Sequence, residues 1–339
     1  AIDLVLSLLG PEDLVVAPHD AYWGTLRLLG ARAERRQFRL ALVDQGDEAA
    51  VARALQDRPR LVLIETPSNP LMRVVDIAGI ACAAETKFPW LIKFLDCRDL
   101  LSVQVHPDDA MARGLLGDES GKTEAWIVLD AGPDARIYAG LRPGIAREDL
   151  ERHLDAGTVA ECLHGFVPRV GDCVFLPAGA VHAVGGGVLL AEVQQSSDAT
   201  FRLFDWNRLG ADGKPRSLHR QEALRSIDWS LGPLGPATPE PHPNPSHGWA
   251  GETLVRCPYF QIDRYRVEAE MPVPGTGQMS VWILLDGRTE LRADGGTYVR
   301  SFQAGQTVLI PASCGPLTWI TSCESPASIL AVTARGLRP

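Results

Sequence analysis

Short runs of alternating apolar and polar residues, separated by glycine and proline turns, recur along most of this chain. The clearest example is the segment 171–193, GDCVFLPAGAVHAVGGGVLLAEV, which contains three apolar runs with turns between them. Runs this short are typical of β-strands, because a helix needs about ten or more residues with an i, i+3, i+4 repeat. Many short strands with Gly and Pro turns favour a barrel. We therefore predict a mainly β fold.

Four polar residues in the predicted strands are spaced to bind one divalent metal: Gln104, His106, Glu124 and His182. Gln104 and His106 are two residues apart, so both project from one face of a strand. Glu124 lies in a run expected to form a neighbouring strand, and His182 follows a Pro-Ala-Gly turn at the mouth of a sheet. These groups suit zinc or a similar ion, with a position open for water or substrate. The alternative is four unrelated polar residues on a barrel wall.

Lysine is scarce in this chain. It occurs at positions 87, 93, 122 and 214, whereas arginine is abundant. Lys122 precedes Glu124 by two residues and would share its strand face. A lysine on this face would provide a compact ammonium group whose proton can be tuned, although it could also have been retained by chance.

From about Lys87 to the C-terminus, the chain resembles the type I mannose-6-phosphate isomerases, metal-dependent enzymes of the cupin superfamily. Five blocks carry the resemblance: FPWLIKFLD (88–96), SVQVHPDD (102–109), GKTEAW (121–126), FLPAGAVHAV (175–184) and AEVQQSSDATFRLFDWNR (191–208). Long ungapped blocks of this kind are highly specific. The resemblance implies two cupin-like double-stranded β-helix barrels, of which the first is catalytic.

The resemblance also implies a site. Its zinc ligands, for one Zn²⁺ per chain, would be Gln104, His106, Glu124 and His182. Its catalytic residues would be Arg202, Glu192 and Lys122, and its substrate-binding residues Ser102, Lys122, Arg202 and Arg208. The arginines would suit the anionic end of a sugar phosphate, because guanidinium groups offer several donors to phosphate oxygens. Alternatively, they form surface ion pairs with Asp198 and Asp205, the commoner fate of arginine.

The implied reaction interconverts mannose 6-phosphate and fructose 6-phosphate. A base removes the proton from C2, a cis-enediol forms, and the proton returns at C1. The metal would orient the sugar and stabilise the developing oxyanion. Glu192, Lys122 and a water molecule on the metal all remain candidates for the base.

Composition and pattern divide the rest of this region. Residues 147–166 suggest a helical insertion with an apolar stripe of Leu150, Leu154 and Val159. Residues 232–249 are rich in proline and read as an extended linker, in which His242 and His247 are expected to face solvent. The catalytic barrel would therefore span 87–231, and a second barrel without metal would span 250–339.

The first 86 residues have a different pattern, with strand-and-turn segments on either side of the helical run DEAAVARALQD (47–57). This α/β segment resembles part of cystathionine γ-synthase, a pyridoxal-phosphate (PLP) enzyme, through AIDLVLSLLGPEDLVVAPHDAYWGT and IETPSNPLMRVVDIA. In that family, residues matching Tyr22 and Asn69 lie near the cofactor. Residues 1–86 contain no lysine, so this truncated segment cannot form an internal aldimine.

The isomerase resemblance begins without that family's usual N-terminal segment, so an open barrel edge is expected. Activity is in doubt for this reason. The alternatives are a catalytically inactive, sugar-binding cupin or hybrid fragment and, less favoured, a PLP-dependent enzyme similar to cystathionine γ-synthase.

The composition fits a cytoplasmic enzyme acting on a small molecule. The formal net charge of -9 disfavours nucleic acid as a partner. No apolar stretch is long enough to span a bilayer, so no membrane partner is expected. The seven cysteines lack CxxC spacing and are expected to be reduced thiols. The sequence does not specify the oligomeric state.

Overall fold

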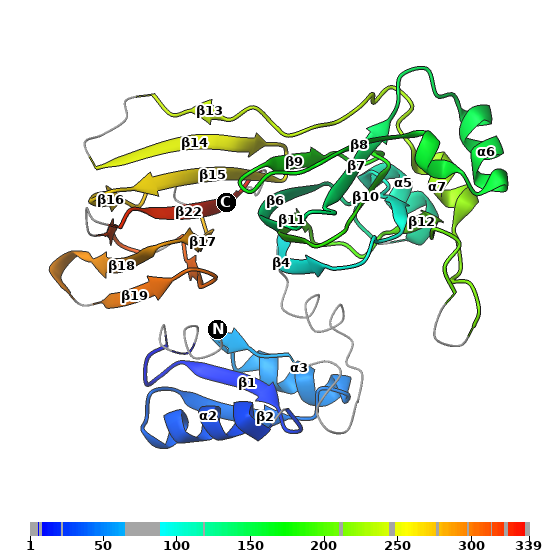
Figure 1. Cartoon of the computed structure of the whole chain (residues 1–339). Coiled ribbons are helices and arrows are strands. Elements are labelled where there is room, and N and C mark those ends of the chain that lie inside the picture. Colours follow the sequence, from blue (N-terminus) through cyan, green and yellow to red (C-terminus); the bar gives the residue numbers. More distant parts are fainter. Residues whose placement is uncertain are drawn as a thin grey trace. The chain divides into compact units, whose positions relative to one another are not determined.

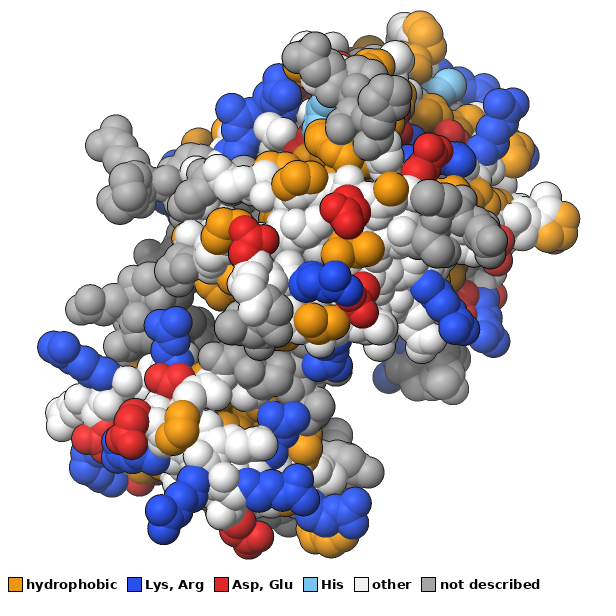
Figure 2. All heavy atoms as spheres, turned by 90° about the vertical axis from the view of Figure 1, so that its left-hand side faces the viewer, with side chains coloured by type: hydrophobic (Ala, Val, Ile, Leu, Met, Phe, Trp, Pro, Cys, Tyr) orange, Lys and Arg blue, Asp and Glu red, His pale blue; other side chains and the backbone are white. Residues whose placement is uncertain are grey.

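The computed structural model describes residues 6, 9–21, 23–64, 89–117, 119–209, 213–243, 248–275, 278–296, 298–312, 314–321 and 325–335. The chain divides into two compact units, Ala1–Lys87 and Phe88–Pro339 (Figure 1). Among the described residues, no helix is long and apolar enough to cross a membrane. On the side shown in Figure 2, acidic and basic side chains of the described residues are interspersed.

The first unit alternates strands and helices, as predicted: β1 (Leu14–Pro18), α2 (Trp23–Glu34), β2 (Arg39–Val43), α3 (Glu48–Gln56) and β3 (Leu61–Val62). The three strands form a parallel sheet in the order β2-β1-β3. β1 is buried along its whole length, as expected for the central strand of a parallel sheet. Asp47 caps α3 by accepting hydrogen bonds from the Ala49 and Ala50 amides. Tyr22 and Asn69 lie outside the described residues.

The second unit begins with a barrel of two antiparallel sheets, in the orders β12-β5-β10-β7-β8 and β4-β11-β6-β9 (Figure 1). Its elements are β4 (Trp90–Cys97), β5 (Val103–Val105), α5 (Asp109–Leu116), β6 (Glu124–Ala131), β7 (Arg136–Leu141), α6 (Arg147–Ala156), η1 (Val159–Glu161), β8 (Leu163–Phe166), β9 (Cys173–Leu176), β10 (His182–Gly185), β11 (Val188–Gln195), β12 (Phe201–Phe204) and α7 (Arg220–Ser226). Trp126 and Leu190 from one sheet pack with Ile137 and Val184 from the other. The predicted β architecture is confirmed.

Strand β4 forms one edge of this barrel. Among the described strands it pairs only with β11. Leu91 and Phe94 of β4 are 40% and 43% exposed, which is high for large apolar side chains. Among the described strands, this edge of the barrel has no further partner and carries exposed apolar side chains.

The helical insertion is shorter than predicted. α6 ends at Ala156 because Gly157 adopts a left-handed conformation (φ +71°), a common helix C-terminal signal. The remainder of the predicted helix forms η1 and β8. The predicted apolar stripe of Leu150, Leu154 and Val159 is buried.

A second barrel follows, with sheets in the orders β13-β14-β15-β22-β17-β20 and β16-β21-β18-β19. Its elements are β13 (Glu240–Pro241), β14 (Trp249–Arg256), β15 (Phe260–Val267), β16 (Glu270–Pro272), β17 (Ser280–Asp286), β18 (Arg288–Ala293), η2 (Asp294–Gly296), β19 (Val299–Gln303), β20 (Thr307–Ile310), β21 (Leu317–Ile320) and β22 (Ala327–Ala334). Aromatic rings fill its interior, where Tyr265 stacks on Trp282 at a centroid distance of 5.5 Å. Trp319 contacts Trp282 and Phe302.

The two barrels share a hydrophobic core. Ile127 and Val193 of the first barrel belong to one buried cluster with Ile262, Ile283 and Val332 of the second. The two barrels therefore stabilise each other by burying apolar surface.

The proline-rich segment lies against both barrels and is not a free linker. The Ala237 amide donates to the Cys173 carbonyl in the first barrel, and β13 pairs with β14 in the second. His242 was expected to face solvent, but its side chain is only 23% exposed. Its Nε2 lies 3.1 Å from Thr253 Oγ1 and 3.2 Å from Asp263 Oδ1. His247 lies outside the described residues.

Five cysteines lie in the described part of the chain, and all five are free thiols: Cys97, Cys162, Cys173, Cys257 and Cys314. The first four are buried, and burial raises the pKa of the Cys97 thiol to about 11. Buried thiols with a raised pKa are poor nucleophiles, so these side chains serve packing.

Candidate metal centre

The predicted ligands come from both sheets of the first barrel. Gln104 in β5 lies directly opposite His182 in β10, because these two strands pair antiparallel. His106 follows the end of β5. Glu124 begins β6, which belongs to the opposite sheet, so the expectation of a strand adjacent to β5 is wrong. The barrel fold therefore brings the carboxylate across from the facing sheet.

His106, Glu124 and His182 form a compact, buried group. His106 Nε2 lies 3.4 Å from Glu124 Oε2, and His182 Nε2 lies 3.4 Å from Glu124 Oε1. One ligand atom from each residue lies within 4.8 Å of the other two. Among the described residues this is the one group of three or more His, Cys, Asp or Glu side chains that meets this distance.

Backbone contacts fix the orientation of both imidazoles. His106 Nδ1 lies 2.9 Å from the Ala199 carbonyl, and His182 Nδ1 lies 2.9 Å from the Ala180 carbonyl. A carbonyl can only accept, so each Nδ1 carries a proton and donates it. In the neutral imidazole, Nε2 then presents a lone pair toward the carboxylate. This hydrogen bonding at the outer nitrogen is typical of metal-binding histidine.

Burial also keeps the two histidines neutral. It lowers the pKa of His182 to about 4, although the charge of Glu124 partly opposes this shift. The pKa of His106 is lowered for the same reason. Imidazole lone pairs that face a buried carboxylate repel it, and a cation held between them would relieve this repulsion. The donor set therefore fits a divalent metal.

Two lysines and a second carboxylate complete the charge balance. Lys122 Nζ lies 2.7 Å from Glu124 Oε2 and donates to His106 Nε2 at 3.1 Å. Glu192 Oε1 lies 4.0 Å from Lys122 Nζ and 2.8 Å from Lys93 Nζ. Sequence reasoning assigned no role to Lys93. The signal was available, since Lys93 is one of four lysines and lies in a family-specific block.

These residues line a cavity of about 240 Å³ in the first barrel. Its polar lining consists of Lys93, Ser102, Gln104, Lys122, Glu124, His182, Glu192 and Thr200. The barrel thus brings together three of the four predicted metal ligands with Ser102, Lys122 and Glu192, and His106 adjoins them. The cavity is large enough for a small polar molecule.

The two predicted arginines differ in their surroundings. Arg202 lies opposite Gln104 in the sheet, and its Nε donates to Ser102 Oγ at 3.3 Å. Arg208 donates to the Leu100 carbonyl and to Asp205 Oδ1, each at 2.5 Å. Arg202 is therefore beside the cavity, whereas Arg208 is held by an ion pair of the kind expected from the alternative interpretation.

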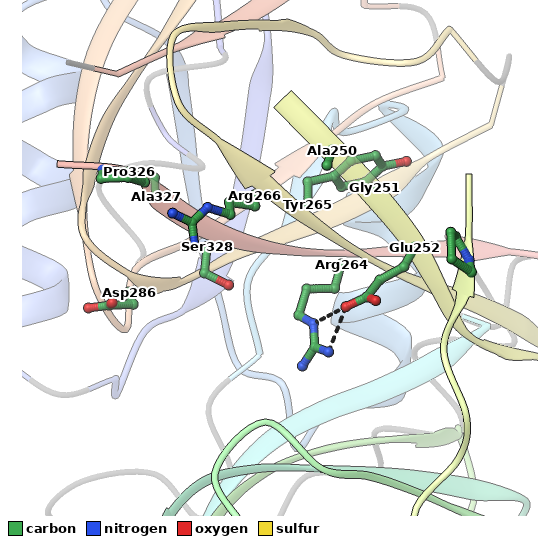
Figure 3. A pocket seen from close by; sticks show the side chains of 11 residues that line it. Ala250, Gly251, Glu252, Arg264, Tyr265, Arg266, Asp286, Pro326, Ala327 and Ser328 are labelled. Atoms are coloured by element: carbon green, nitrogen blue, oxygen red, sulfur yellow. Dashed lines mark hydrogen bonds and ion pairs between the residues drawn. The ribbon is translucent and has the colours of Figure 1, made fainter. Parts of the chain in front are cut away.

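A larger cavity, of about 660 Å³, lies on the second barrel, on β14, β15, β17 and β22 (Figure 3). Arg264 and Glu252 pair across two of these strands, as Figure 3 shows. Arg264 Nη2 lies 2.6 Å from Glu252 Oε1. Of the two acidic residues that line this cavity, Glu252 and Asp286, the first forms this ion pair. It offers no group of ligands comparable with that of the first barrel in the described residues.

Comparison with known proteins identifies the second unit. The chain is 34% identical over 232 residues to mannose-6-phosphate isomerase ManA of Bacillus subtilis, a match that covers 68% of this chain and 71% of that protein. The chain belongs to the mannose-6-phosphate isomerase family. Among solved structures, the mannose 6-phosphate isomerase from Bacillus subtilis is similar with a TM-score of 0.65 and 26% identity, over 73% of this chain and 75% of that one.

The first unit matches a different group of proteins. The family described as "Cys/Met metabolism PLP-dependent enzyme" matches residues 1–96 of this chain. Cystathionine gamma-synthase of Escherichia coli is 57% identical over 81 residues, which is 24% of this chain and 21% of that enzyme. The predicted junction between two kinds of sequence is therefore confirmed.

The buried histidines predict how stability depends on pH. Unfolded histidine has a pKa of about 6.5, so between about pH 6.5 and 4 the unfolded chain binds a proton that folded His182 does not. The free energy of unfolding of the metal-free protein should therefore fall with decreasing pH in this window, by up to about 1.4 kcal/mol per pH unit from this residue. Urea unfolding of wild type and His182→Asn should show a smaller slope in the variant; equal slopes would refute the assignment.

Proposed function

We propose that this chain is a zinc-dependent enzyme that interconverts mannose 6-phosphate and fructose 6-phosphate. One observation carries the proposal: two neutral imidazoles and a buried carboxylate point their ligand atoms at one another inside a barrel of this family. The proposed catalytic domain is residues 87–231, followed by the segment 232–249 and a second barrel, 250–339, which we propose holds no metal.

Zinc would be held by His106, His182, Glu124 and the amide oxygen of Gln104. The two imidazoles supply the nitrogen ligands that zinc prefers, and Glu124 supplies the neutralising charge. Gln104 Nε2 donates to Ser102 Oγ, which leaves the amide oxygen available as the fourth ligand. Bound zinc would act as a Lewis acid toward the oxygen atoms of the sugar.

The substrate phosphate would bind beside Ser102 and Arg202. Burial, together with the positive charges of Arg216 and Arg208, lowers the pKa of the Arg202 guanidinium. Clustered cations are mutually unfavourable, and an anionic phosphate would relieve that repulsion. The overall negative charge of the chain makes this local cluster more significant. Arg208 would support the site through its charge and its bond to Leu100.

Glu192 is the favoured base for moving the proton between C2 and C1. Burial and the charge of Glu124 raise its pKa, while Lys122 and Lys93 oppose the shift. A carboxylate with a raised pKa is a better proton acceptor near neutral pH. It would take the proton from C2 while the C1 oxygen takes up a proton from water, giving the cis-enediol. The proton would then return to C1 while the C2 hydroxyl gives a proton to water and becomes the ketone.

Lys122 would assist by its charge. Its ammonium group lies between the carboxylates of Glu124 and Glu192, and it is buried, with only 8% of the side chain exposed. A fixed positive charge in a buried site stabilises negative charge that develops on the sugar oxygens.

The test is an isomerase assay on purified full-length protein, with mannose 6-phosphate as substrate and fructose 6-phosphate as the measured product. We expect about one zinc per chain, loss of turnover after chelation, and recovery when zinc is restored. Zinc bound at this ratio without turnover would instead favour a sugar-binding cupin. An absorption band from an aldimine would favour a PLP enzyme.

The proposed substrate is a small molecule, and the proposed location is the cytoplasm. The free thiols of the described cysteines are compatible with a reducing compartment. Nothing in this proposal requires a nucleic acid or a membrane.

A further inference from the structure

A tyrosine hydroxyl group of the second barrel forms a hydrogen bond to an aspartate close to the proposed metal ligands of the first barrel. Tyr259 precedes β15, and its Oη donates to Asp109 Oδ2 at 2.7 Å. Asp109 is the first residue of α5 and lies three residues after His106. Tyr259 also packs against the core that the two barrels share. The hydroxyl therefore links a part of the second barrel that is packed on the shared core to the chain next to a proposed metal ligand.

The other oxygen of Asp109 holds the segment that leads to Glu124. Asp109 Oδ1 accepts from the Gly121 amide at 2.8 Å and from Gln195 Nε2 at 3.1 Å. Gly121 lies so close to α5 that an added Cβ would be 2.5 Å from the Asp109 backbone nitrogen. Only glycine fits at this distance, so the two segments are packed backbone to backbone.

Gln195 extends the same network to Thr123. Its side-chain Oε1 accepts from the Thr123 backbone amide at 2.8 Å, and its backbone amide donates to the Thr123 carbonyl at 3.0 Å. The Lys122 amide donates to the Pro107 carbonyl at 3.0 Å. The residues on both sides of Lys122 are therefore fixed, and Glu124 follows immediately.

Burial alone would raise the pKa of Asp109, but the hydrogen bonds from Tyr259, Gly121 and Gln195 lower it. The carboxylate is thus ionised and accepts from all three donors. Hydrogen bonds to a charged acceptor are stronger than those between neutral groups. Thr123 and Gln195 are buried, and Asp109 and Tyr259 are partly buried.

We propose that Tyr259 is a positioning residue of the metal centre, acting through Asp109. By fixing that carboxylate, it holds the start of α5 and the Gly121–Thr123 segment in one arrangement. His106 and Glu124 are thereby held at a fixed position relative to each other, although they come from opposite sheets. The second barrel thus contributes to the geometry of the site, beyond packing. This inference rests on the proposed function in taking His106 and Glu124 as zinc ligands.

The test compares two substitutions of the same kind. Tyr259→Phe removes the hydroxyl and keeps the ring. Tyr298→Phe is the matched control, because its hydroxyl is buried without a hydrogen-bond partner in the part of the chain described. Two measurements are made on full-length protein: amide hydrogen exchange of the peptide covering residues 119–126 without metal, and the zinc dissociation constant by competition with a chelator.

We expect faster exchange in this peptide for Tyr259→Phe and a zinc affinity lower by about tenfold, the lower end of what outer partners of metal ligands contribute. Tyr298→Phe should match wild type in both. Unchanged exchange and affinity in Tyr259→Phe, or equal changes in both variants, would overturn the proposal.

Asp109→Asn breaks the same link from the other side and replaces Tyr259→Phe if that variant does not fold. In the double variant the two losses of zinc affinity should be less than additive, since both substitutions remove the same contact, from Tyr259 to Asp109. Additive losses would contradict the mechanism. Wild-type protein that binds no zinc would refute the proposed function, whereas the exchange measurement would still decide whether Tyr259 positions this segment.

Discussion

His106→Ala is expected to remove both the bound zinc and the isomerase activity. The substitution deletes one of two neutral nitrogen ligands and leaves Glu124 facing Lys122 and a single imidazole. Because removal of an outer partner already lowers metal affinity by about 10- to 100-fold, loss of a direct ligand should lower it by more than about 100-fold. Metal content by mass spectrometry and turnover of mannose 6-phosphate should fall together.

His164→Ala is the control for this experiment. His164 lies in β8 and contacts Phe166, away from the proposed ligands. This variant should retain zinc and turnover. If His106→Ala kept one zinc per chain, the proposed ligand set would be wrong; if it lost zinc but kept turnover, the metal would have no part in the reaction.

Glu192→Gln is expected to lower turnover by about 10²- to 10⁴-fold, the range for loss of a general base. The amide has nearly the same shape as the carboxylate but cannot accept the C2 proton. Substrate binding should change little, because Ser102 and Arg202 remain in place, so the loss should be in kcat with KM nearly unchanged. Steady-state kinetics with the zinc content measured on the same sample would separate these effects.

Glu290→Gln provides the comparison, because Glu290 pairs with Arg292 in the second barrel and makes no contact with the site among the described residues. It should have wild-type kinetics. Wild-type turnover in Glu192→Gln would remove Glu192 from the role of base and leave Lys122 as the side chain to test. A loss of zinc in this variant would show that Glu192 acts on the metal site and not on the proton.

The sequence predicts well those features that depend on local pattern. The two-residue spacing of Gln104 and His106 indicates a common strand face, and the turn before His182 indicates the mouth of a sheet. Gln104 and His182 both line the cavity, and His106 lies next to it. The stripe of Leu150 and Leu154 is buried because an i, i+4 spacing defines one face of a helix.

Features that depend on non-local pairing were not predictable from the pattern. Alternation shows which face a residue occupies but not which sheet its strand joins, so Glu124 was assigned beside β5 although it lies opposite. Tyr259 meets Asp109 across 150 residues, and no local signal marks that contact. His242 looked solvent-exposed because proline-rich composition says nothing about the Thr253 and Asp263 side chains that it contacts.

Composition distinguishes the two parts of the chain that meet at about residue 87. The absence of lysine in residues 1–86 excludes an internal aldimine on that segment whatever its fold. Its parallel sheet and its match to part of cystathionine gamma-synthase agree with the interpretation of this segment as an α/β fragment of such an enzyme. The chemistry proposed here therefore lies in the first barrel.

The most direct test of the central claim is anomalous diffraction at the zinc absorption edge, using crystals of the zinc-loaded protein. We predict one strong peak per chain, with the Nε2 atoms of His106 and His182 at about 2.0–2.1 Å from the ion and oxygen atoms of Glu124 and Gln104 beside it. A peak at another place, or no peak in crystals of protein that turns over mannose 6-phosphate, would contradict the account.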